Sequence, residues 1–331
     1  MKILIIGRYK QQFQQNLLPF VLEQGESLRA LGCEIAYFAV KGNYLLAVKH
    51  LKKKILEYHP DIVHAHYGLS AITAELQSLV PVVTTFHNGE TLNIGVNILT
   101  SLFSKRAEHV IYVAQHIRDL VWFKAKHYSI IPCGVNLDDC RLIDQQEARL
   151  TLGMLPDVKY ILFGGGFDNL RKNYALLRDV VQQTEGQEWT PVDGGERCGN
   201  IVCLEMKGLN REECVLRMNA CDLFALPSHS EGSPQALKEA MACNCPIIAT
   251  DVADVRTLLG DLPGHYILRN PRKTHERWDA DEKSLDEMRD LLTNALTHDA
   301  RTTGRDRILE LGLSNEQVAK RLIAIYNQVL M

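Results

Sequence analysis

Two glutamates stand eight positions apart in the stretch LPSHSEGSPQALKEAMACNCPIIAT, residues 226–250. Glu231 adjoins a Gly-Ser-Pro turn, whereas Glu239 lies among leucine, alanine and methionine. Ser233 is a favoured N-cap and Pro234 a favoured first helical residue, so we predict that a helix begins there. Glu231 then lies in the loop before the helix, and about 7–8 Å of helix rise separates Pro234 from Glu239.

Carboxylates at that separation do not share a proton, and they suit two separate hydroxyl groups on one extended ligand. The free N–H groups and the positive dipole of the helix N-terminus between them favour a phosphate. Together these features predict a nucleotide-sugar pocket. The alternative for Glu239 is a solvated glutamate on a surface helix. Its neighbours Leu237, Ala240 and Met241 disfavour that alternative, because an acid in an apolar setting need not face water.

Short apolar runs alternate with helical patterns along the chain and would form the strands that carry these loops. The pattern begins with KILIIG, CEIAYFAV, DIVHAHY and PVVTTFH, and it restarts near residue 144 with VKYILFGGG, NIVCLEMKG, DLFALPS and PIIAT. Such alternation predicts parallel sheets covered by helices on both faces. We therefore predict two doubly wound α/β domains, residues 1–143 and 144–313. A C-terminal helix, residues 314–331, is a candidate to cross back to the first domain.

The composition is that of an ordinary globular protein, with 46% hydrophobic and 23% charged residues among 331. No apolar run reaches 18 residues, and the apolar part of MKILIIGRYK is too short for a secretory signal, so we expect a cytoplasmic protein. Nine cysteines without a CxxC or other metal spacing fit reduced structural thiols. The net charge of −3 excludes a strongly basic nucleic-acid binder.

The stretch around the two glutamates resembles the E-x7-E signature of glycosyltransferase family 4, a family of retaining enzymes with the GT-B fold. The segments DIVHAHYGLSA, PVVTTFHNGE, IIPCGVN and ECVLRMNACDLFALPS are similar to that family in its usual order, so the resemblance covers nearly the whole chain. It implies two Rossmann-like domains facing a central cleft. The N-terminal domain would hold the acceptor, and the C-terminal domain would hold the nucleotide-sugar donor.

The resemblance also implies roles for individual residues. Glu239 would accept hydrogen bonds from the ribose hydroxyls of the donor. Glu231 would hold sugar hydroxyls or the leaving-group side. Lys172 would neutralise the leaving diphosphate, and His87 would reach the transferred sugar. The other residues expected to contact the donor are Gly165, Gly166, Arg171, Gly232, Ser233, Gln235 and Ala236.

Several positions depart from the family's pattern. Gly166 stands where the family usually has an arginine, six positions before Lys172, and Arg171 is the candidate to supply the second positive charge. On the acceptor side, Asn88 and Glu90 replace a common glycine and a common aspartate. The first loop, GRYKQQFQQ, lacks the GxGxxG pattern and so leaves the acceptor-side loop undefined.

Two histidines on the run DIVHAHY, His64 and His66, should point to the same face of their strand. A metal pair is one reading, but no third Cys, His or carboxylate ligand is placed to complete it. We prefer His66 as a residue that lines the acceptor side, and the alternative is that it fills the core.

These features predict a retaining, metal-independent glycosyltransferase that transfers a sugar to a hydroxyl of a saccharide or lipid-linked acceptor. Glu231, Lys172 and His87 are the predicted catalytic residues, with no protein nucleophile and no cofactor besides the donor. The alternatives are a GT-B epimerase or phosphorylase, and a non-catalytic homologue that binds a nucleotide sugar. Gly166 is the best support for the non-catalytic alternative.

A lysine-rich helix near residue 50 offers a second surface of interest. Its other face is predicted to pack Leu45, Leu46, Val48, Leu51 and Ile55 into the core, which leaves a solvated basic face. The alternative is weak peripheral membrane contact. The lysines concerned are Lys49, Lys52, Lys53 and Lys54.

Overall fold

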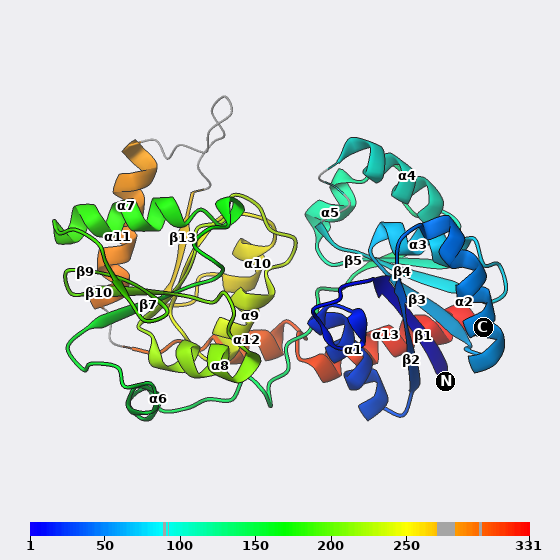
Figure 1. The fold of residues 1–331 in the computed structure, drawn as a ribbon, viewed down its shortest axis with the longest axis horizontal. Helices are drawn as coiled ribbons and strands as arrows, with labels where there is room; N and C mark the ends of the chain where they lie inside the picture. The colour runs from blue at the N-terminus through cyan, green and yellow to red at the C-terminus, as the bar shows by residue number, and fades with distance from the viewer. Residues whose placement is uncertain (89–90, 92, 270–281, 298–299) are drawn as a thin grey trace. The chain divides into compact units, whose positions relative to one another are not determined.

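The computed structural model describes residues 1–88, 91, 93–269, 282–297 and 300–331. These residues form two compact units, each an α/β unit with its own sheet (Figure 1). The first unit is Met1–Gly134 together with Gly312–Met331, and the second is Val135–Leu311. The division after Gly134 precedes the boundary predicted at residue 143, and the C-terminal helix belongs to the first unit.

The first unit contains a six-stranded sheet in the order β2-β1-β3-β4-β5-β6. Every neighbouring pair in it is parallel, as the alternation of apolar runs and helices predicts. The carboxyl ends of the strands therefore meet along one edge. The strands are β1 (Lys2–Arg8), β2 (Glu34–Val40), β3 (Ile62–His66), β4 (Val82–Phe86), β5 (His109–Tyr112) and β6 (Tyr128–Ile130).

Helices cover both faces of this sheet. Ile3 and Ile5 of β1 pack under α1 and α13, whereas Leu4 and Ile6 of the same strand pack under α2 and α3, because successive side chains of a strand point to opposite faces. The last helix thus completes a core that begins with the third residue. The helices are α1 (Pro19–Ala30), α2 (Tyr44–Tyr58), α3 (Gly68–Glu75), α4 (Ile94–Ser104), α5 (Gln115–Leu120) and α13 (Asn315–Leu330), with a short 3₁₀ turn η1 (Gln14–Asn16).

The buried face of α2 differs from the predicted one. Ala47, Leu51 and Ile55 are buried, four residues apart along the helix. Leu45 and Leu46, predicted to lie in the core, are 65% and 70% exposed. They lie in the first turn, where their backbone N–H groups bond the side chain of the N-cap, Asn43. The prediction for these two leucines was wrong because the face set by 47, 51 and 55 leaves them outside it.

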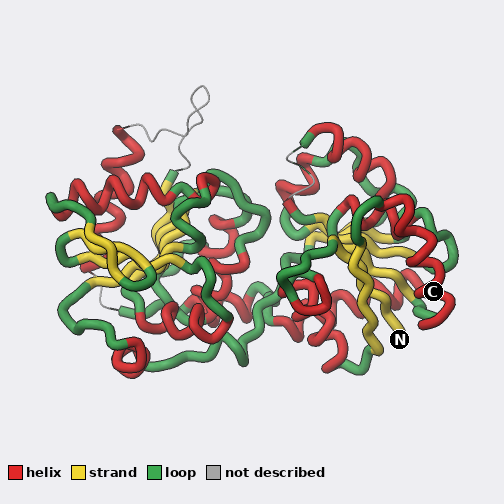
Figure 2. Tube along the Cα trace, viewed as in Figure 1, coloured by secondary structure: helices red, strands yellow, loops and turns green. Residues whose placement is uncertain are grey.

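The second unit contains a seven-stranded sheet in the order β13-β12-β11-β7-β10-β9-β8. Five strands are parallel, and β9 and β8 extend the sheet as an antiparallel hairpin that the alternating pattern does not predict. Figure 2 shows the strands of each unit in yellow. The strands are β7 (Lys159–Phe163), β8 (Thr190–Val192), β9 (Gly195–Cys198), β10 (Ile201–Glu205), β11 (Leu223–Leu226), β12 (Ile247–Thr250) and β13 (His265–Leu268).

The core of the second unit includes Ile161 and Phe163 of β7 with Leu177 and Val180 of α7, all buried.

Among the helices of the described residues, none is both long enough and apolar enough to span a membrane. The helices of this unit are α6 (Gln145–Leu152), α7 (Tyr174–Glu185), α8 (Arg211–Ala220), α9 (Gln235–Ala242), α10 (Val255–Leu259), α11 (Glu282–Thr297) and α12 (Gly304–Glu310), with a 3₁₀ turn η3 (Leu170–Lys172).

Candidate functional site

The loops that follow β7 and β11 bring a carboxylate and two cations together. The two strands are parallel neighbours, so their following loops emerge at the same edge of the sheet. Lys172 Nζ donates to Glu231 Oε1 at 2.7 Å, and Arg171 Nη1 donates to Glu231 Oε2 at 3.1 Å. Arg171 also donates to the carbonyl of Ser230 at 2.7 Å. Both turn η3 and the loop before α9 are therefore tied to one carboxylate.

The electrostatics of this cluster keep Glu231 ionised. The side chain of Glu231 is 7% exposed and that of Lys172 14%, whereas Arg171 is 42% exposed. Burial raises the pKa of Glu231, but the ammonium of Lys172 and the guanidinium of Arg171 outweigh burial and hold the pKa below its usual value. The two cations are thus held in place by a buried charge before any ligand arrives.

Glycine is required next to this cluster. A Cβ on Gly165 would lie 2.9 Å from Lys172 Cγ, so the missing side chain gives Lys172 its path across the loop. A Cβ on Gly166 would lie 2.7 Å from Asp168 Oδ1 and 2.9 Å from Lys207 Cδ. Lys207 bonds Asp168 at 2.6 Å. The space beside Gly166 therefore already contains a cation, which the sequence pattern did not reveal.

Helix α9 starts later than predicted. Its first residue is Gln235 and its N-cap is Pro234, which makes no side-chain capping bond. The prediction that Ser233 is the N-cap was wrong. The Ser233 hydroxyl instead donates to Asp254 Oδ2 at 2.7 Å, just before α10. The loop that carries Glu231 is thereby joined to the next loop of the same edge.

Glu239 lies on the buried part of α9 and is 8% exposed, so it is not surface filler. Its carboxylate accepts a hydrogen bond from Nη1 of Arg211, which is the first residue of α8. Asn210 caps that helix, with Glu213 completing a capping box. Arg211 was not among the predicted site residues. The available signal was a cation in the first turn of a helix, where the dipole disfavours it.

In the first unit, three histidines stack at the carboxyl ends of β3 and β4. The rings of His64 and His66 lie 4.6 Å apart, and those of His66 and His87 lie 5.5 Å apart. His64 and His66 therefore share one face of β3, as predicted. His64 Nδ1 lies 2.6 Å from the Tyr326 hydroxyl of α13, and its Nε2 lies 2.7 Å from Thr85 Oγ1.

His64 and His66 are neutral at physiological pH. Burial lowers the pKa of His66 to about 3. Burial and the neighbouring histidines lower the pKa of His64 well below its usual value. His66 Nδ1 lies 3.2 Å from His87 Nε2, so one of the two nitrogens donates and the other accepts. His66 is inaccessible to solvent, and in this conformation it contacts His87 from the protein interior.

The other positions predicted on the acceptor side are Asn88 and Glu90. Asn88 is half-buried, and its carbonyl accepts a hydrogen bond from the Thr91 hydroxyl at 3.0 Å. Glu90 lies outside the described residues. Among the residues that the structure describes, no group of three or more His, Cys, Asp or Glu side chains is arranged to hold a metal ion.

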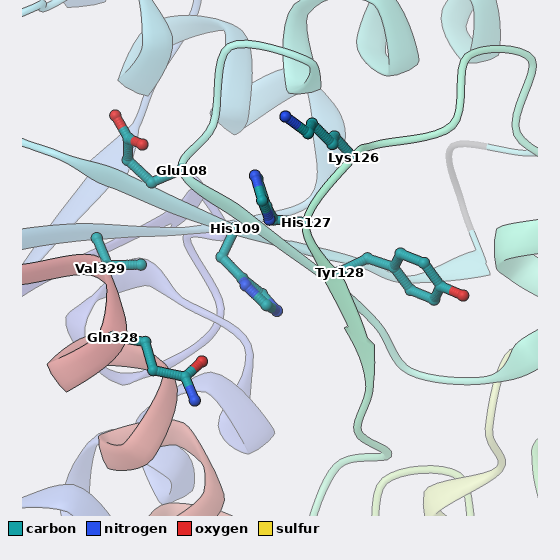
Figure 3. Close-up of a pocket in the computed structure, with 7 residues that line it drawn as sticks. All are labelled: Glu108, His109, Lys126, His127, Tyr128, Gln328 and Val329. Carbon is teal, nitrogen blue, oxygen red and sulfur yellow. The ribbon is translucent and has the colours of Figure 1, made fainter.

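The sheet of the first unit also has a cavity at its other edge, away from the predicted acceptor-side residues. Its volume is about 410 Å³, and it is lined by residues that include Glu108, His109, Tyr128 and Gln328 (Figure 3). His109 and Tyr128 are the first residues of β5 and β6, so the cavity lies at the amino ends of the strands. Ligands of parallel sheets bind at the opposite edge, where His87 lies.

Comparison with known proteins agrees with this arrangement. The sequence model described as Glycosyltransferase Family 4 matches residues 29–139, and the model described as Glycosyl transferases group 1 matches residues 204–275. The first match thus lies within the first unit, apart from its last residues, and the second lies within the second unit.

Two curated relatives illustrate the sequence similarity. A Bacillus subtilis protein named for glycosyl transfer in teichuronic acid biosynthesis, TuaC, is 27% identical over 64% of this chain and 58% of its own length. A D-inositol 3-phosphate glycosyltransferase of Mycobacterium marinum is 24% identical over 61% of this chain and 51% of its own length. The alignments thus span between half and two thirds of these relatives.

Solved structures match over almost the whole chain. Sucrose-phosphate synthase from Thermosynechococcus elongatus has a TM-score of 0.76 at 18% identity, with 99% of this chain and 98% of that chain covered. HepE from Anabaena in complex with UDP has a TM-score of 0.72 at 14% identity, with 99% and 100% covered. These matches define the class as α/β proteins with the GT-B fold of two Rossmann-like domains. Within that class, stretches of both units are similar in sequence to glycosyltransferases.

Proposed function

We propose that the protein is a retaining, metal-independent glycosyltransferase that moves a sugar from a nucleotide-sugar donor to a hydroxyl of a saccharide or lipid-linked acceptor. The observation that carries the proposal is the cluster of Glu231 with Lys172 and Arg171 at the carboxyl edge of the second sheet. The matches to two glycosyltransferase families support it. A complex of HepE with UDP-glucose supports a nucleotide sugar as the donor class.

The second unit would bind the donor. Glu239 would accept hydrogen bonds from the ribose hydroxyls, which requires Arg211 to share or release its carboxylate. Glu231 would hold Lys172 and Arg171 ready for the diphosphate and contact the sugar side of the donor. Hydrogen-bond donors and cations that are already positioned where negative charge develops are usually the main source of transition-state stabilisation. The further donor contacts would come from Gly165, Gly166, Gly232, Ser233, Gln235 and Ala236.

The leaving charge needs more than one cation, and the chain offers two candidates for the second. Arg171 bonds Glu231 directly. Lys207 occupies the space beside Gly166, where the family's arginine would begin. We assign the role to Arg171, because it shares a carboxylate with Lys172. A larger loss of kcat in Lys207→Met than in Arg171→Met would transfer the role to Lys207.

The first unit would bind the acceptor, with His87 as its sugar-contacting histidine and Asn88 and Glu90 on the acceptor side. His66 would act through His87, because its Nδ1 faces His87 Nε2 at 3.2 Å. We assign no protein nucleophile. The sugar–diphosphate bond would break toward an oxocarbenium-like state, the acceptor oxygen would enter on the same face, and a diphosphate oxygen would take its proton. The configuration at the anomeric carbon would thus be retained.

The first experiment is a thermal-shift panel of UDP-, GDP-, ADP- and CMP-sugars, since a ligand that binds only the folded state raises Tm by mass action. We expect one nucleotide to stabilise the protein clearly more than the others. Turnover of that donor should persist in excess EDTA, and NMR of the product should show the donor's anomeric configuration. A panel in which no nucleotide sugar raises Tm would refute the donor site, and loss of turnover with EDTA would refute metal independence.

The same protein and the selected donor also distinguish two competing functions. A non-catalytic homologue, suggested by Gly166, would bind the selected donor tightly without hydrolysing or transferring it. An epimerase would convert the donor without any acceptor, and a phosphorylase would transfer the sugar to inorganic phosphate in place of an acceptor hydroxyl. Product analysis of one incubation with radiolabelled donor distinguishes these outcomes from glycosyl transfer.

We also propose a cytoplasmic location with weak contact to anionic membranes through α2. Lys49 and Lys53 are exposed on that helix, and Lys52 and Lys54 are half-buried. Co-sedimentation with vesicles that contain anionic lipid should exceed that with neutral vesicles and should fall as salt is raised. Equal sedimentation with both vesicle types would refute the contact.

A further inference from the structure

A small pocket opens at the carboxyl edge of the sheet of the first unit. Its volume is about 230 Å³, below the range of about 300–1,000 Å³ typical of drug-sized ligands. It therefore suits one compact group rather than a whole nucleotide. Arg8 is the last residue of β1, Tyr67 follows β3, and Tyr44 opens α2. Lys10 also lines it, and its remaining walls are apolar, from Leu18, Leu69 and Val96.

The positive charges of this pocket are those of Arg8 and Lys10. Within the described ranges, neither Arg8 nor Lys10 forms an ion pair with an Asp or Glu side chain. The backbone of Lys10 is fixed by a hydrogen bond to the carbonyl of Asn16 at 2.7 Å, which holds the start of its side chain at the pocket. Two cations without counter-charges on a concave surface attract an anion. Guanidinium and ammonium groups bind phosphate or carboxylate through charge-assisted hydrogen bonds.

The charge of the Arg8 guanidinium affects Tyr44, a residue that lines the pocket. Burial raises the pKa of the Tyr44 hydroxyl, and the nearby Arg8 partly opposes that rise. The charge therefore lies close enough to a pocket tyrosine to affect its ionisation. Arg8 and Lys10 belong to the loop GRYKQQFQQ, which replaces the glycine-rich loop expected from the resemblance. This chain has cationic side chains where bare backbone was expected.

The pocket adjoins the histidine stack through Tyr67. The ring of Tyr67 lies 4.6 Å from that of His87, and its backbone has a φ of 70°, a left-handed value that is unfavourable for a bulky residue. Strain of this kind persists where the surrounding structure fixes it, and it is concentrated at binding sites. Tyrosine faces also pack well against sugar rings, because they combine an apolar surface with a hydroxyl group.

We propose that this pocket binds an anionic group of the acceptor, a phosphate or a carboxylate, held by Arg8 and Lys10 with a sugar ring against Tyr44 and Tyr67. The inference rests on the proposed glycosyltransferase function, and it narrows the acceptor from any saccharide to an acidic one. The anion has three possible sources: a sugar phosphate, a uronic acid or a lipid-linked phosphate. Leu45, directly after Tyr44, is 65% exposed, which is why a lipid-linked source is tested beside the soluble ones.

Calorimetry without any donor tests the pocket directly. The probes are glucose 6-phosphate, glucuronate and glucose, and decaprenyl phosphate in neutral phosphatidylcholine vesicles against the same vesicles alone. We expect at least one anionic probe to bind ~10-fold or more tightly than its neutral counterpart, because a hydrogen bond to a charged group is worth that much. The anionic probe that binds most tightly identifies the source.

Three variants locate the binding. Arg8→Gln and Lys10→Gln should each weaken the selected anionic probe by ~10-fold and leave the neutral probe unchanged. Lys126→Gln is the matched control, because it removes one positive charge from an exposed side chain that lines a different cavity of the same unit. Its affinity for the anionic probe should match that of the wild type. The stabilisation of each variant by donor nucleotide should be unchanged, since the donor residues lie in the other unit.

Each result decides between defined outcomes. Equal binding of charged and neutral probes would overturn the inference, and so would an equal loss of affinity in all three variants. Transfer to neutral acceptors alone would overturn it while leaving the proposed function intact. Charge-dependent binding in a protein that transfers no sugar from any nucleotide would instead overturn the proposed function and leave an anion site.

Discussion

Replacing Lys172 with methionine tests the central ion pair without knowledge of the substrate. The variant keeps the length of the side chain but removes the ammonium that donates to Glu231 at 2.7 Å. The carboxylate is 7% exposed and would keep, among the described residues, the half-exposed Arg171 as its ion-pair partner. Removal of one partner from a buried pair costs about 3–5 kcal/mol. We expect the lower end, about 3 kcal/mol, because Arg171 remains.

Thermal unfolding measures this loss. For a unit of this size, 3 kcal/mol corresponds to a Tm lower by roughly 6–12 °C at pH 7. The pKa of Glu231 is depressed in the folded protein, so the stability that this residue contributes is present above its ordinary value of 4.5 and is lost as the pH falls through the folded pKa. The difference between wild type and Lys172→Met should therefore shrink when the scan is repeated below pH 4.5.

The matched control is Arg256→Met. Arg256 bonds Asp251 at 2.6 Å in the same unit, but both side chains are solvent-exposed, so the loss of this pair should leave Tm nearly unchanged. A Tm for Lys172→Met equal to that of the control would refute the argument that burial makes the Glu231 pair strong. A difference that persists at low pH would refute its electrostatic origin.

The remaining predictions concern three other buried groups. Glu239→Gln should weaken the selected nucleotide roughly 5- to 150-fold in calorimetry, because a neutral amide accepts less well from ribose hydroxyls, and unchanged affinity would remove the ribose role. Tyr326→Phe should lower the free energy of unfolding by about 1–3 kcal/mol in urea titration, since it leaves buried His64 Nδ1 without its partner at 2.6 Å; an unaltered midpoint would contradict that bond. Burial raises the pKa of Glu75 to about 8, so this residue costs stability as the pH rises from 4.5 to about 8. Glu75→Gln should stabilise the protein by up to about 5 kcal/mol above pH 8 and by little at pH 4, and a gain independent of pH would refute the shift.

Local sequence patterns were sufficient for most of the elements and for part of the site. The period of the apolar runs and their separation by helical segments predicted parallel strands, because burial on both faces demands continuous apolar side chains. Glu231 and Glu239 stood out by their spacing around a loop and a helix start, whereas Lys172 was implied by the resemblance to glycosyltransferase family 4. His64 and His66 followed from the two-residue period of a strand. The inferences drawn from the residues alone depend on neighbours close in the chain.

Tertiary structure decided which groups meet. Lys172 and Glu231 are 59 residues apart, and only the adjacency of β7 and β11 places them within 2.7 Å. Arg211 reaches Glu239 because α8 and α9 pack together, and Tyr326 reaches His64 across 262 residues because α13 returns to the first sheet. The pocket of Arg8 likewise joins the ends of separate strands.

The start of α9 and the buried face of α2 were also decided at this level. The local sequence favoured Ser233 as an N-cap, but its hydroxyl donates a hydrogen bond to Asp254, which no local pattern places beside it. Leu45 and Leu46 are apolar, but their first turn lies outside the face set by Leu51 and Ile55. The sequence by itself determined most of the secondary elements, because those depend on short-range periodicity. Partners, burial and charge state were left to the order of the strands, since only that order brings distant side chains within contact.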